Sequence, residues 1–345
     1  MWKNDFLYWE NSLSNTAKGR DCGSMPLIRR RMSMRKNILL AAVAFAATAM
    51  FGGVQAQAAD YAVILKTLAN PFWQGVQEGV KTKAAELGVE VDVFASPSED
   101  DTQAQLQLFE DVLNRGYKGV VFAPISPVNL VQPAAKAYKG GIPLVNIDEQ
   151  IDVAGLNQAG ANIEAFVTTD NKDVGKKGAQ FIIETLGSAG GEVAIVEGKP
   201  GVASGEARKA GATEAFTGAA GIKLVASQAA DWDRLKALDV AANILQASPD
   251  LKAFYCANDT MALGVVQAVQ NAGKAGQILV VGTDGAPEAR ASVAAGRLTA
   301  TVAQDPQKMG GDGLALVVEA AKSGKLIAVN ATAKQVAVDS VLVTK

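Results

Sequence analysis

The stretch Tyr61-Ala-Val-Ile-Leu65 is a short apolar run, and the turn Lys66-Thr-Leu-Ala-Asn-Pro-Phe-Trp73 joins it to an amphipathic segment at 72–87. A run of about five apolar residues bounded by a turn is typical of a buried strand. Gly88 directly follows the amphipathic segment, and glycine is a common residue after the end of a helix. The sequence therefore predicts a strand, a turn and a helix as its first unit.

The same alternation continues along the chain in two series. The first series adds strands at 89–94, 119–123 and 143–147 and helices at 102–114 and 129–138. The second series starts near Thr169, with helices at 171–186, 205–216, 232–247 and 259–272 and strands at 192–196, 222–226, 253–257 and 278–282. Strands that alternate with helices of this length form parallel sheets. Two series contain more strand–helix units than one open sheet usually holds, so we expect an α/β fold of two doubly wound parallel-sheet lobes.

Composition excludes several function classes. The 345 residues are 49% hydrophobic and 20% charged, which is ordinary for a globular protein. The chain has no histidine, so it has no Ser-His-Asp triad and no His-ligated metal site. The formal net charge is −2 without a long basic run, which argues against nucleic acid as a partner. Without histidine we expect no metal site. We also expect no cofactor, because the first turn lacks the glycines of a dinucleotide-binding loop.

The first 59 residues have the pattern of an N-terminal extension and a signal peptide. Basic residues between 29 and 36 precede an apolar run at 38–50, and Ala56-Gln57-Ala58 follows. These are the three regions of a secretory leader, with cleavage expected near Ala58 or Ala59. Translation from Met32 or Met34 would give a leader of ordinary length. A membrane anchor is the alternative, but the apolar run is shorter than the ~20 residues that a span needs. The pattern predicts export to the bacterial periplasm.

Of the two cysteines, Cys22 lies in this predicted leader. Cys256 would then be the single cysteine of the exported chain, which rules out an intramolecular disulfide. Its place in a predicted buried strand favours an inert core thiol.

Polar and aromatic residues gather just after the predicted strands, where doubly wound sheets bind their ligands. They are Asn70, Phe72, Trp73, Asp148, Asn258 and Asp284. Carboxylates and amides can bond adjacent hydroxyl groups, and aromatic faces can cover the apolar face of a sugar ring. Each Asp or Asn could instead cap the helix that follows it, and Trp73 could be a core residue. Their recurrence at equivalent strand ends favours a site for a neutral polyhydroxylated ligand.

Two further residues have open interpretations. Trp232 lies among charges in Asp231-Trp-Asp233-Arg234, which suggests either a binding platform or a contact between lobes. Arg208, on a predicted helix, would by default be a solvated surface charge.

Seven motifs in order resemble the type I periplasmic sugar-binding proteins of ABC transporters, over residues 61–345. They are Leu68-Ala-Asn70-Pro-Phe72-Trp73, Val145-Asn-Ile-Asp148-Glu149, Ala203-Ser-Gly-Glu-Ala-Arg208, Ser227-Gln-Ala-Ala-Asp-Trp232-Asp-Arg234, Ala257-Asn258-Asp-Thr-Met-Ala-Leu-Gly264, Val281-Gly-Thr-Asp284-Gly and Ala300-Thr-Val-Ala-Gln304. The resemblance implies a hinge-bending receptor that closes on a monosaccharide. It implies hydroxyl-bonding roles for Asn70, Asp148, Arg208, Asn258, Asp284 and Gln304, and stacking roles for Phe72, Trp73 and Trp232.

Within that family, the chain is similar to the allose-binding branch rather than the ribose-binding branch. The features that distinguish it are Lys66, tryptophan at both 73 and 232, and Glu149 after Asp148. The resemblance therefore implies D-allose as the ligand, with Lys66 and Glu149 added to the ligand-binding set. D-ribose, D-psicose or another monosaccharide is the alternative within the same receptor class.

The resemblance also implies a division of the chain and a set of partners. A three-segment hinge would cross near 169–170, 304–305 and 331–334, giving an N-terminal lobe of 60–169 plus 305–332 and a C-terminal lobe of 170–304 plus 333–345. The expected partners of this monomer are a permease in the inner membrane and, as a further option, a chemoreceptor.

Two rival functions stay open on the same scaffold. A sugar-sensing transcription repressor would need a DNA-binding helix-turn-helix before Tyr61, where the predicted leader stands. A glycosidase could use Asp148 and Asp284 as paired carboxylates, but the resemblance is to binding proteins, so we expect no enzymatic activity.

Overall fold

The computed structural model describes residues 59–345. The predicted extension, signal peptide and translation start therefore lie outside the described residues. Within this range, no helix combines the length and the apolar character that a bilayer span requires.

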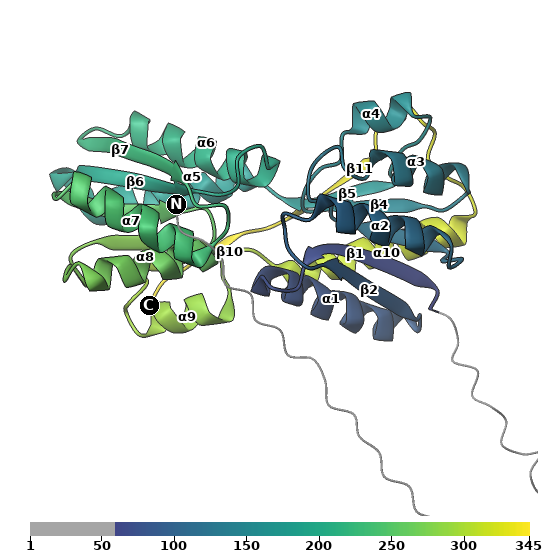
Figure 1. Cartoon of the computed structure of the whole chain (residues 1–345), viewed down its shortest axis with the longest axis horizontal. Helices are drawn as coiled ribbons and strands as arrows, with labels where there is room; N and C mark the ends of the chain where they lie inside the picture. Colours follow the sequence, from purple (N-terminus) through teal and green to yellow (C-terminus); the bar gives the residue numbers. More distant parts are fainter. Residues whose placement is uncertain (1–58) are drawn as a thin grey trace, which may run out of the picture. The chain divides into compact units, whose positions relative to one another are not determined.

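The N-terminal lobe is built on a six-stranded sheet whose strand order is β11-β5-β4-β3-β1-β2, with every pair parallel (Figure 1). Its elements are β1 (Tyr61–Thr67), α1 (Pro71–Leu87), β2 (Val91–Ser96), α2 (Thr102–Leu113), β3 (Gly119–Phe122), α3 (Val131–Lys139), β4 (Leu144–Ile147), α4 (Val153–Gln158), β5 (Ala165–Thr169), α10 (Pro306–Ser323) and β11 (Lys334–Val338).

The C-terminal lobe has a second six-stranded sheet in the order β12-β10-β9-β8-β6-β7, parallel except where β12 pairs with β10. Its elements are α5 (Asn171–Leu186), the short 3₁₀ turn Gly187–Ala189, β6 (Gly191–Glu197), α6 (Ala203–Gly218), β7 (Ile222–Ala229), α7 (Arg234–Ala247), β8 (Leu251–Cys256), α8 (Asp259–Asn271), β9 (Leu279–Asp284), α9 (Pro287–Ala294), β10 (Ala300–Ala303) and β12 (Val341–Val343). The predicted α/β fold with two doubly wound lobes is confirmed.

The first unit shows why this sequence folds as it does. Asn70 caps α1 by accepting a hydrogen bond from the Phe72 backbone N–H, and Pro71 occupies the first turn, where its missing N–H has no cost. The helix ends at Gly88, whose φ of 64° suits glycine. The strand β1 is buried along its whole length. These local signals hold the polar turn at 66–73 at the carboxyl end of the sheet.

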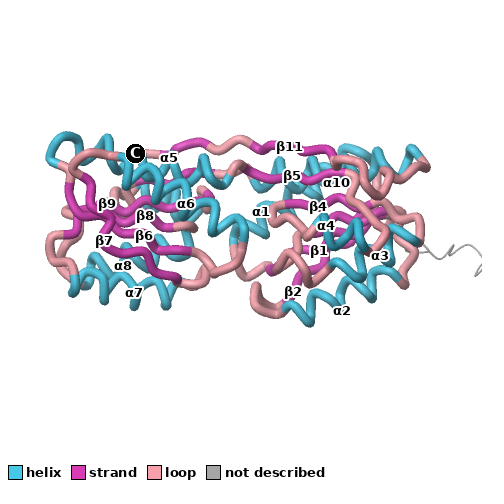
Figure 2. The backbone as a smooth tube through the Cα atoms, turned by 90° about the horizontal axis from the view of Figure 1, so that it is seen from above, coloured by secondary structure: helices cyan, strands magenta, loops and turns pink. Residues whose placement is uncertain are grey.

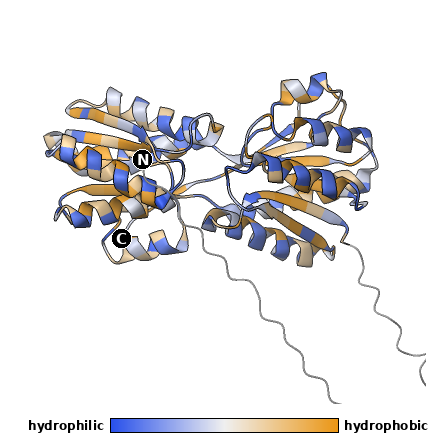
Figure 3. Ribbon diagram, viewed as in Figure 1, coloured by the Kyte–Doolittle hydropathy of each residue, from blue (hydrophilic) through white to orange (hydrophobic). Residues whose placement is uncertain are grey.

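Helices cover both faces of each sheet. In the N-terminal lobe, α1 and α10 pack on one face, around Val76 and Val317, while α2 and α3 pack on the other, around Phe109 and Ala134. The C-terminal lobe repeats this arrangement with α7 and α8 on one face and α5 and α6 on the other. Figure 3 shows the apolar strands between helices whose outer faces are hydrophilic. Each lobe therefore has its own core.

The chain passes between the lobes three times: after β5, after β10 and after β11. The predicted third crossing at 331–334 is wrong, because residues 334–338 form β11 and pair with β5 of the N-terminal lobe. Figure 2 shows β11 beside β5. The chain then enters the C-terminal lobe as β12. Lys177 fixes this late crossing by donating hydrogen bonds from Nζ to the carbonyl and hydroxyl oxygens of Ser340.

Candidate functional site

Side chains from both lobes line one cavity with about 330 Å³ of empty space, which we call the inter-lobe cavity. The lining residues are Lys66, Asn70, Phe72, Trp73, Glu99, Asp148, Ser204, Arg208, Trp232, Asn258, Asp284 and Gln304. Ten of the eleven residues in the predicted ligand-binding set are among them. Glu149 is the exception.

On the N-terminal wall, Lys66 pairs with Asp148. The distance from Lys66 Nζ to Asp148 Oδ2 is 3.2 Å, and both side chains are buried. Burial by itself would lower the pKa of Lys66, but the charges of Asp148 and Glu149 outweigh that effect and leave the pKa raised. The amine therefore stays protonated and presents N–H donors inside the cavity.

Asn70 and Trp73 share one partner on this wall. Asn70 Nδ2 and Trp73 Nε1 both donate to Glu99 Oε1, at 3.2 and 2.9 Å. Asn70 Oδ1 also caps α1, so the residue is a helix cap and a cavity residue at once. Phe72 meets the Trp73 ring edge to face, with centroids 5.0 Å apart.

Glu99 and Ser204 line the cavity but were absent from the predicted set. Glu99 follows β2, which has a strand end like the others, so extending the strand-end argument to β2 would have found it. Ser204 lies in the first turn of α6, inside a motif already quoted for Arg208, but nothing in the sequence marks its hydroxyl.

On the C-terminal wall, Arg208 is buried, so the default interpretation of a solvated charge is wrong. Its Nε donates to Asn171 Oδ1 at 2.8 Å, and its Nη1 donates to the Ala257 carbonyl at 2.8 Å. Nη1 also lies 3.1 Å from Asp284 Oδ1. Three partners in its own lobe fix the orientation of the guanidinium group.

Asp284 and Gln304 complete this wall. Burial raises the pKa of Asp284 to about 6, although Arg208 and the hydrogen bond from Gln304 oppose the shift. Gln304 Nε2 donates to Asp284 Oδ1 at 2.7 Å. Its other amide atom, Oε1, is buried without a hydrogen-bond partner among the described residues. A buried acceptor of this kind needs a donor, which a ligand hydroxyl in the cavity would supply.

Strained backbone positions set the carboxylates in place. Asp148 has a φ of 60° and Asp284 a φ of 109°, and each directly follows or ends a central strand. Positive φ is uncommon for residues other than glycine and is concentrated at functional sites. Asn258 also follows a strand, β8, and accepts from the Met261 N–H as the cap of α8.

Trp232 is seated on two glycines. Its φ is 67° and that of Asp231 is 54°, so two successive residues adopt left-handed backbone. A Cβ added to Gly198 would overlap the indole ring, and one on Gly205 would crowd it. The glycines therefore leave the space that the ring occupies beside the cavity, which agrees with the platform interpretation.

Glu149 lies behind Lys66, with 3.7 Å between Lys66 Nζ and Glu149 Oε2. Instead of facing the cavity, its carboxylate crosses to the C-terminal lobe and accepts from the backbone N–H of Ala203 at 2.7 Å. Burial raises the pKa of Glu149, while Lys66 and the α6 backbone N–H groups oppose that shift.

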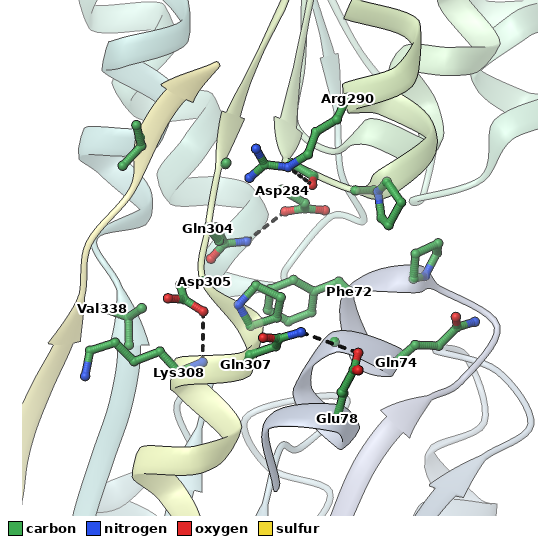
Figure 4. A pocket seen from close by; sticks show the side chains of 18 of the residues that line it. Phe72, Gln74, Glu78, Asp284, Arg290, Gln304, Asp305, Gln307, Lys308 and Val338 are labelled. Carbon is green, nitrogen blue, oxygen red and sulfur yellow. Dashed lines mark hydrogen bonds between the residues drawn. The ribbon is translucent and has the colours of Figure 1, made fainter. Parts of the chain in front are cut away.

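A larger pocket lies beside the inter-lobe cavity, between α1, α9 and the chain crossings at 303–308 and 338–341 (Figure 4). It shares Phe72, Asp284 and Gln304 with the cavity. Several of its other polar side chains are already paired, as when Gln307 donates to Glu78 and Arg290 donates to the Gly285 carbonyl. We therefore place the candidate site in the smaller inter-lobe cavity, where buried donors, acceptors and aromatic rings from both lobes converge.

The fully buried Cys256 takes no part in this site. Burial raises the pKa of its thiol well above the usual value, so it remains protonated in β8. Among residues 59–345, no group of His, Cys, Asp and Glu is arranged to hold a metal ion.

Three comparisons relate the chain to known proteins. The D-allose-binding periplasmic protein of Escherichia coli K12 is 64% identical over 288 residues, which cover 84% of this chain and 93% of that protein. The D-ribose/D-allose-binding protein of Pseudomonas aeruginosa is 35% identical over 286 residues, covering 80% and 87%. A solved ABC transporter solute-binding protein of Actinobacillus succinogenes with bound D-allose has a TM-score of 0.77 and 33% identity, covering 82% and 96%.

The family model described as a periplasmic binding protein domain matches residues 61–326, which is most of the chain and spans both lobes. With two doubly wound lobes, three crossings and a polar cavity between the lobes, the fold agrees with that match. The chain therefore belongs to the periplasmic binding protein family.

Proposed function

We propose that this protein is a periplasmic receptor that captures a monosaccharide, D-allose, and delivers it to an ABC permease. The observation that carries the proposal is the inter-lobe cavity itself. Its walls combine two buried ion pairs, an unpartnered amide oxygen and three aromatic rings, which is the chemistry that a hydroxyl-rich ring with apolar faces requires.

Each cavity residue has a role in this proposal. Asn70, Asp148, Arg208, Asn258, Asp284 and Gln304 bond sugar hydroxyls, while Phe72, Trp73 and Trp232 cover the ring faces. Glu99 joins the acceptors, since its carboxylate already orients two cavity residues. Lys66 donates to a hydroxyl that only some sugars carry at that position, which gives the site its selectivity.

D-allose is favoured by the relatives. The E. coli protein with 64% identity is named for D-allose, and the A. succinogenes structure contains it. The ribose import binding protein RbsB of E. coli, at 32% identity, is more distant.

Capture follows from hinge bending. The lobes we propose are 60–169 with 305–338 and 170–304 with 341–345, joined at the three crossings. A sugar that bonds both walls binds the closed form more tightly than the open form, so it shifts the equilibrium toward closure. The closed receptor then docks on a permease. Chemoreceptor docking, a monomeric state and removal of a leader near Ala58 or Ala59 are parts of the same proposal.

Isothermal titration tests the ligand. The purified protein is unfolded and refolded to remove bound sugar, then titrated with D-allose, D-ribose, D-psicose, D-glucose and D-galactose. We expect submicromolar binding of D-allose and much weaker binding of D-ribose and D-glucose. Tight binding of a different sugar would replace D-allose as the proposed ligand. Absence of binding to every sugar in the panel would overturn the proposal.

An enzymatic role is disfavoured by the pairing of both candidate carboxylates. Asp148 is held by Lys66 and Asp284 by Arg208, and the relatives are binding proteins. Incubation with aryl glycosides and analysis of products checks this: we expect no release of the aglycone.

A further inference from the structure

We infer that Glu149 is a latch between the lobes, which holds the closed form by capping helix α6 from the opposite lobe. Glu149 thus sets how long a bound sugar is retained without contacting the sugar. This inference rests on the proposed capture of a sugar by lobe closure and names a residue that controls it.

The latch consists of one carboxylate and two residues across the cleft. Glu149 directly follows Asp148 beyond β4 of the N-terminal lobe, and its side chain is fully buried. Oε1 accepts from Ala203 N–H at 2.7 Å, and Oε2 lies 3.4 Å from Ser204 N and 3.3 Å from Ser204 Oγ. Ala203 and Ser204 are the first two residues of α6 in the C-terminal lobe. Every one of these bonds must break when the lobes separate.

Helix α6 has no side-chain cap from its own lobe. Its N-cap residue, Val202, has no oxygen in its side chain and makes no side-chain cap hydrogen bond. By contrast, α5, α7 and α8 are capped by Asp170, Asp233 and Asn258 of their own lobe. Free N–H groups and the helix dipole make the N-terminus of α6 a site for a negative charge. The carboxylate of Glu149 supplies that charge only when the lobes are closed.

The position of α6 connects the latch to the ligand site. The same helix carries Arg208, which lines the cavity one turn further on. On the other side, Lys66 Nζ lies between Asp148 and Glu149, at 3.2 and 3.7 Å. When the latch closes, Glu149 therefore contacts Lys66 of the N-terminal wall and, at the same time, the helix that carries Arg208 of the C-terminal wall.

A second contact across the cleft differs in burial. Lys199 of the C-terminal lobe pairs with Asp100 of the N-terminal lobe, but the Asp100 side chain is 78% exposed. Exposed pairs of this kind contribute little because water and salt screen them. Within residues 59–345, Glu149 is thus the better candidate for the contact that holds the lobes together.

A latch has a kinetic signature that a ligand contact lacks. If the fraction of protein that can close falls, the apparent affinity falls by the same factor, whichever sugar is bound. Loss of the latch should therefore speed the release of every sugar by a similar factor and leave the preference between sugars unchanged. Loss of a residue that bonds the sugar should change that preference.

Two variants remove the latch from opposite sides. Glu149→Gln removes the charge and one acceptor. Ala203→Pro removes the N–H at the first helical position, where proline is tolerated, and Val202 already has the extended backbone (φ −86°, ψ 119°) that precedes proline. Glu206→Gln is the matched control, because Glu206 lies in the first turn of the same helix but bonds Gly201 of its own lobe.

Release of D-allose and of the next-best sugar is followed by stopped-flow fluorescence of Trp73 and Trp232, and lobe separation by small-angle X-ray scattering with and without D-allose. We expect Glu149→Gln and Ala203→Pro each to speed release of both sugars on the order of tenfold, with association rates unchanged. The double variant should release no faster than the worse single variant, since both changes break one contact. Glu206→Gln should behave as the wild type.

Wild-type release rates in both latch variants would overturn the latch but not the proposed capture of a sugar. A change in the preference between sugars would also overturn the latch. If Glu149→Gln does not fold, Ala203→Pro decides alone. A wild type that binds none of the sugars would overturn the proposed function instead. In that case scattering still tests the latch, because the variants must then be more open than the wild type without sugar.

Discussion

The two walls of the cavity use the same device in different ways. Lys66–Asp148 and Arg208–Asp284 are both buried ion pairs at the carboxyl ends of sheet strands, and each aspartate has a positive φ. Arg208 is fixed by bonds to its own lobe, whereas the Lys66 cluster reaches through Glu149 to the opposite lobe. We infer that the C-terminal wall is preformed within its own lobe, whereas the support behind the N-terminal wall depends on contact with the opposite lobe.

The largest expected effect is on the preformed wall. Arg208→Met leaves the carboxylate of Asp284 buried without its cation, and breaking a buried pair in this way costs about 3–5 kcal/mol. We expect D-allose binding to fall by more than a hundredfold and the melting temperature to fall as well. Titration calorimetry and thermal unfolding measure the two effects.

Arg234→Met is the control for that variant, since Arg234 pairs with Glu288 at the surface. We expect it to change stability and binding little. If both variants behaved alike, burial would not distinguish the two arginines, and the preformed wall would lose its support.

The next effect concerns the Trp232 platform of the same wall. Gly198→Ala places a methyl group where the indole ring lies, so the ring must move. We expect D-allose affinity to fall roughly tenfold, since a displaced ring loses its apolar contact with the sugar. Gly218→Ala, with open space around its Cβ, is the control. Unchanged affinity in Gly198→Ala would show that Trp232 does not cover the ligand.

A more selective effect on binding is expected on the N-terminal wall, where Lys66→Met should also lower the melting temperature because it leaves Asp148 buried without its cation. Lys66→Met removes the donor that we assign to a sugar-specific hydroxyl, so the ratio of D-allose to D-ribose affinity should fall several-fold. Titration with both sugars measures the ratio, with the exposed Lys81→Met as control. Equal losses for both sugars would assign Lys66 to closure rather than to selectivity.

The last prediction concerns how the stability of the C-terminal lobe depends on pH. Burial raises the pKa of Asp259 to about 8, with the nearby charge of Asp284 adding to the shift. A carboxyl pKa above its unfolded value of about 3.8 means that folding penalises the charged form, so stability falls as pH rises toward 8. We expect the melting temperature of the wild type to fall between pH 5 and 9 more than that of Asp259→Asn.

The expected difference over that range is on the order of a few kcal/mol, because stability falls by about 1.4 kcal/mol for each pH unit between pH 5 and 8. Asp259 also accepts bonds from Thr301 and the Ala286 N–H, so the variant should be the less stable protein at pH 5. The exposed Asp239→Asn should follow the wild type at every pH. Parallel pH profiles for Asp259→Asn and wild type would contradict the prediction.

The sequence was a good guide where local patterns decide the structure. Apolar runs followed by Asn or Asp located the central strands and the carboxyl ends that line the cavity, and Asn70 and Asn258 proved to be helix caps as well as cavity residues. It was a poor guide to partners distant in the chain. The burial of Arg208 depends on Asn171 and Asp284, and no local pattern reports that.

Partners distant in the chain also decide two other features. Glu149 was predicted as a ligand residue from the family pattern, but its partners at 203 and 204, which the sequence does not indicate, belong to the other lobe. The third crossing was predicted too early because β11 is short and mostly exposed, so its sequence has little apolar pattern. What makes it a strand of the N-terminal lobe is its pairing with β5.

The late return of the chain has a consequence for biosynthesis. The N-terminal lobe begins at Tyr61, yet one face of its sheet is covered by Met309, Leu314 and Val317 of α10, and its edge strand is β11. The C-terminal lobe likewise acquires its edge strand from β12. The core of the N-terminal lobe therefore cannot close until the ribosome has passed residue 338, after nearly all of the C-terminal lobe has been made.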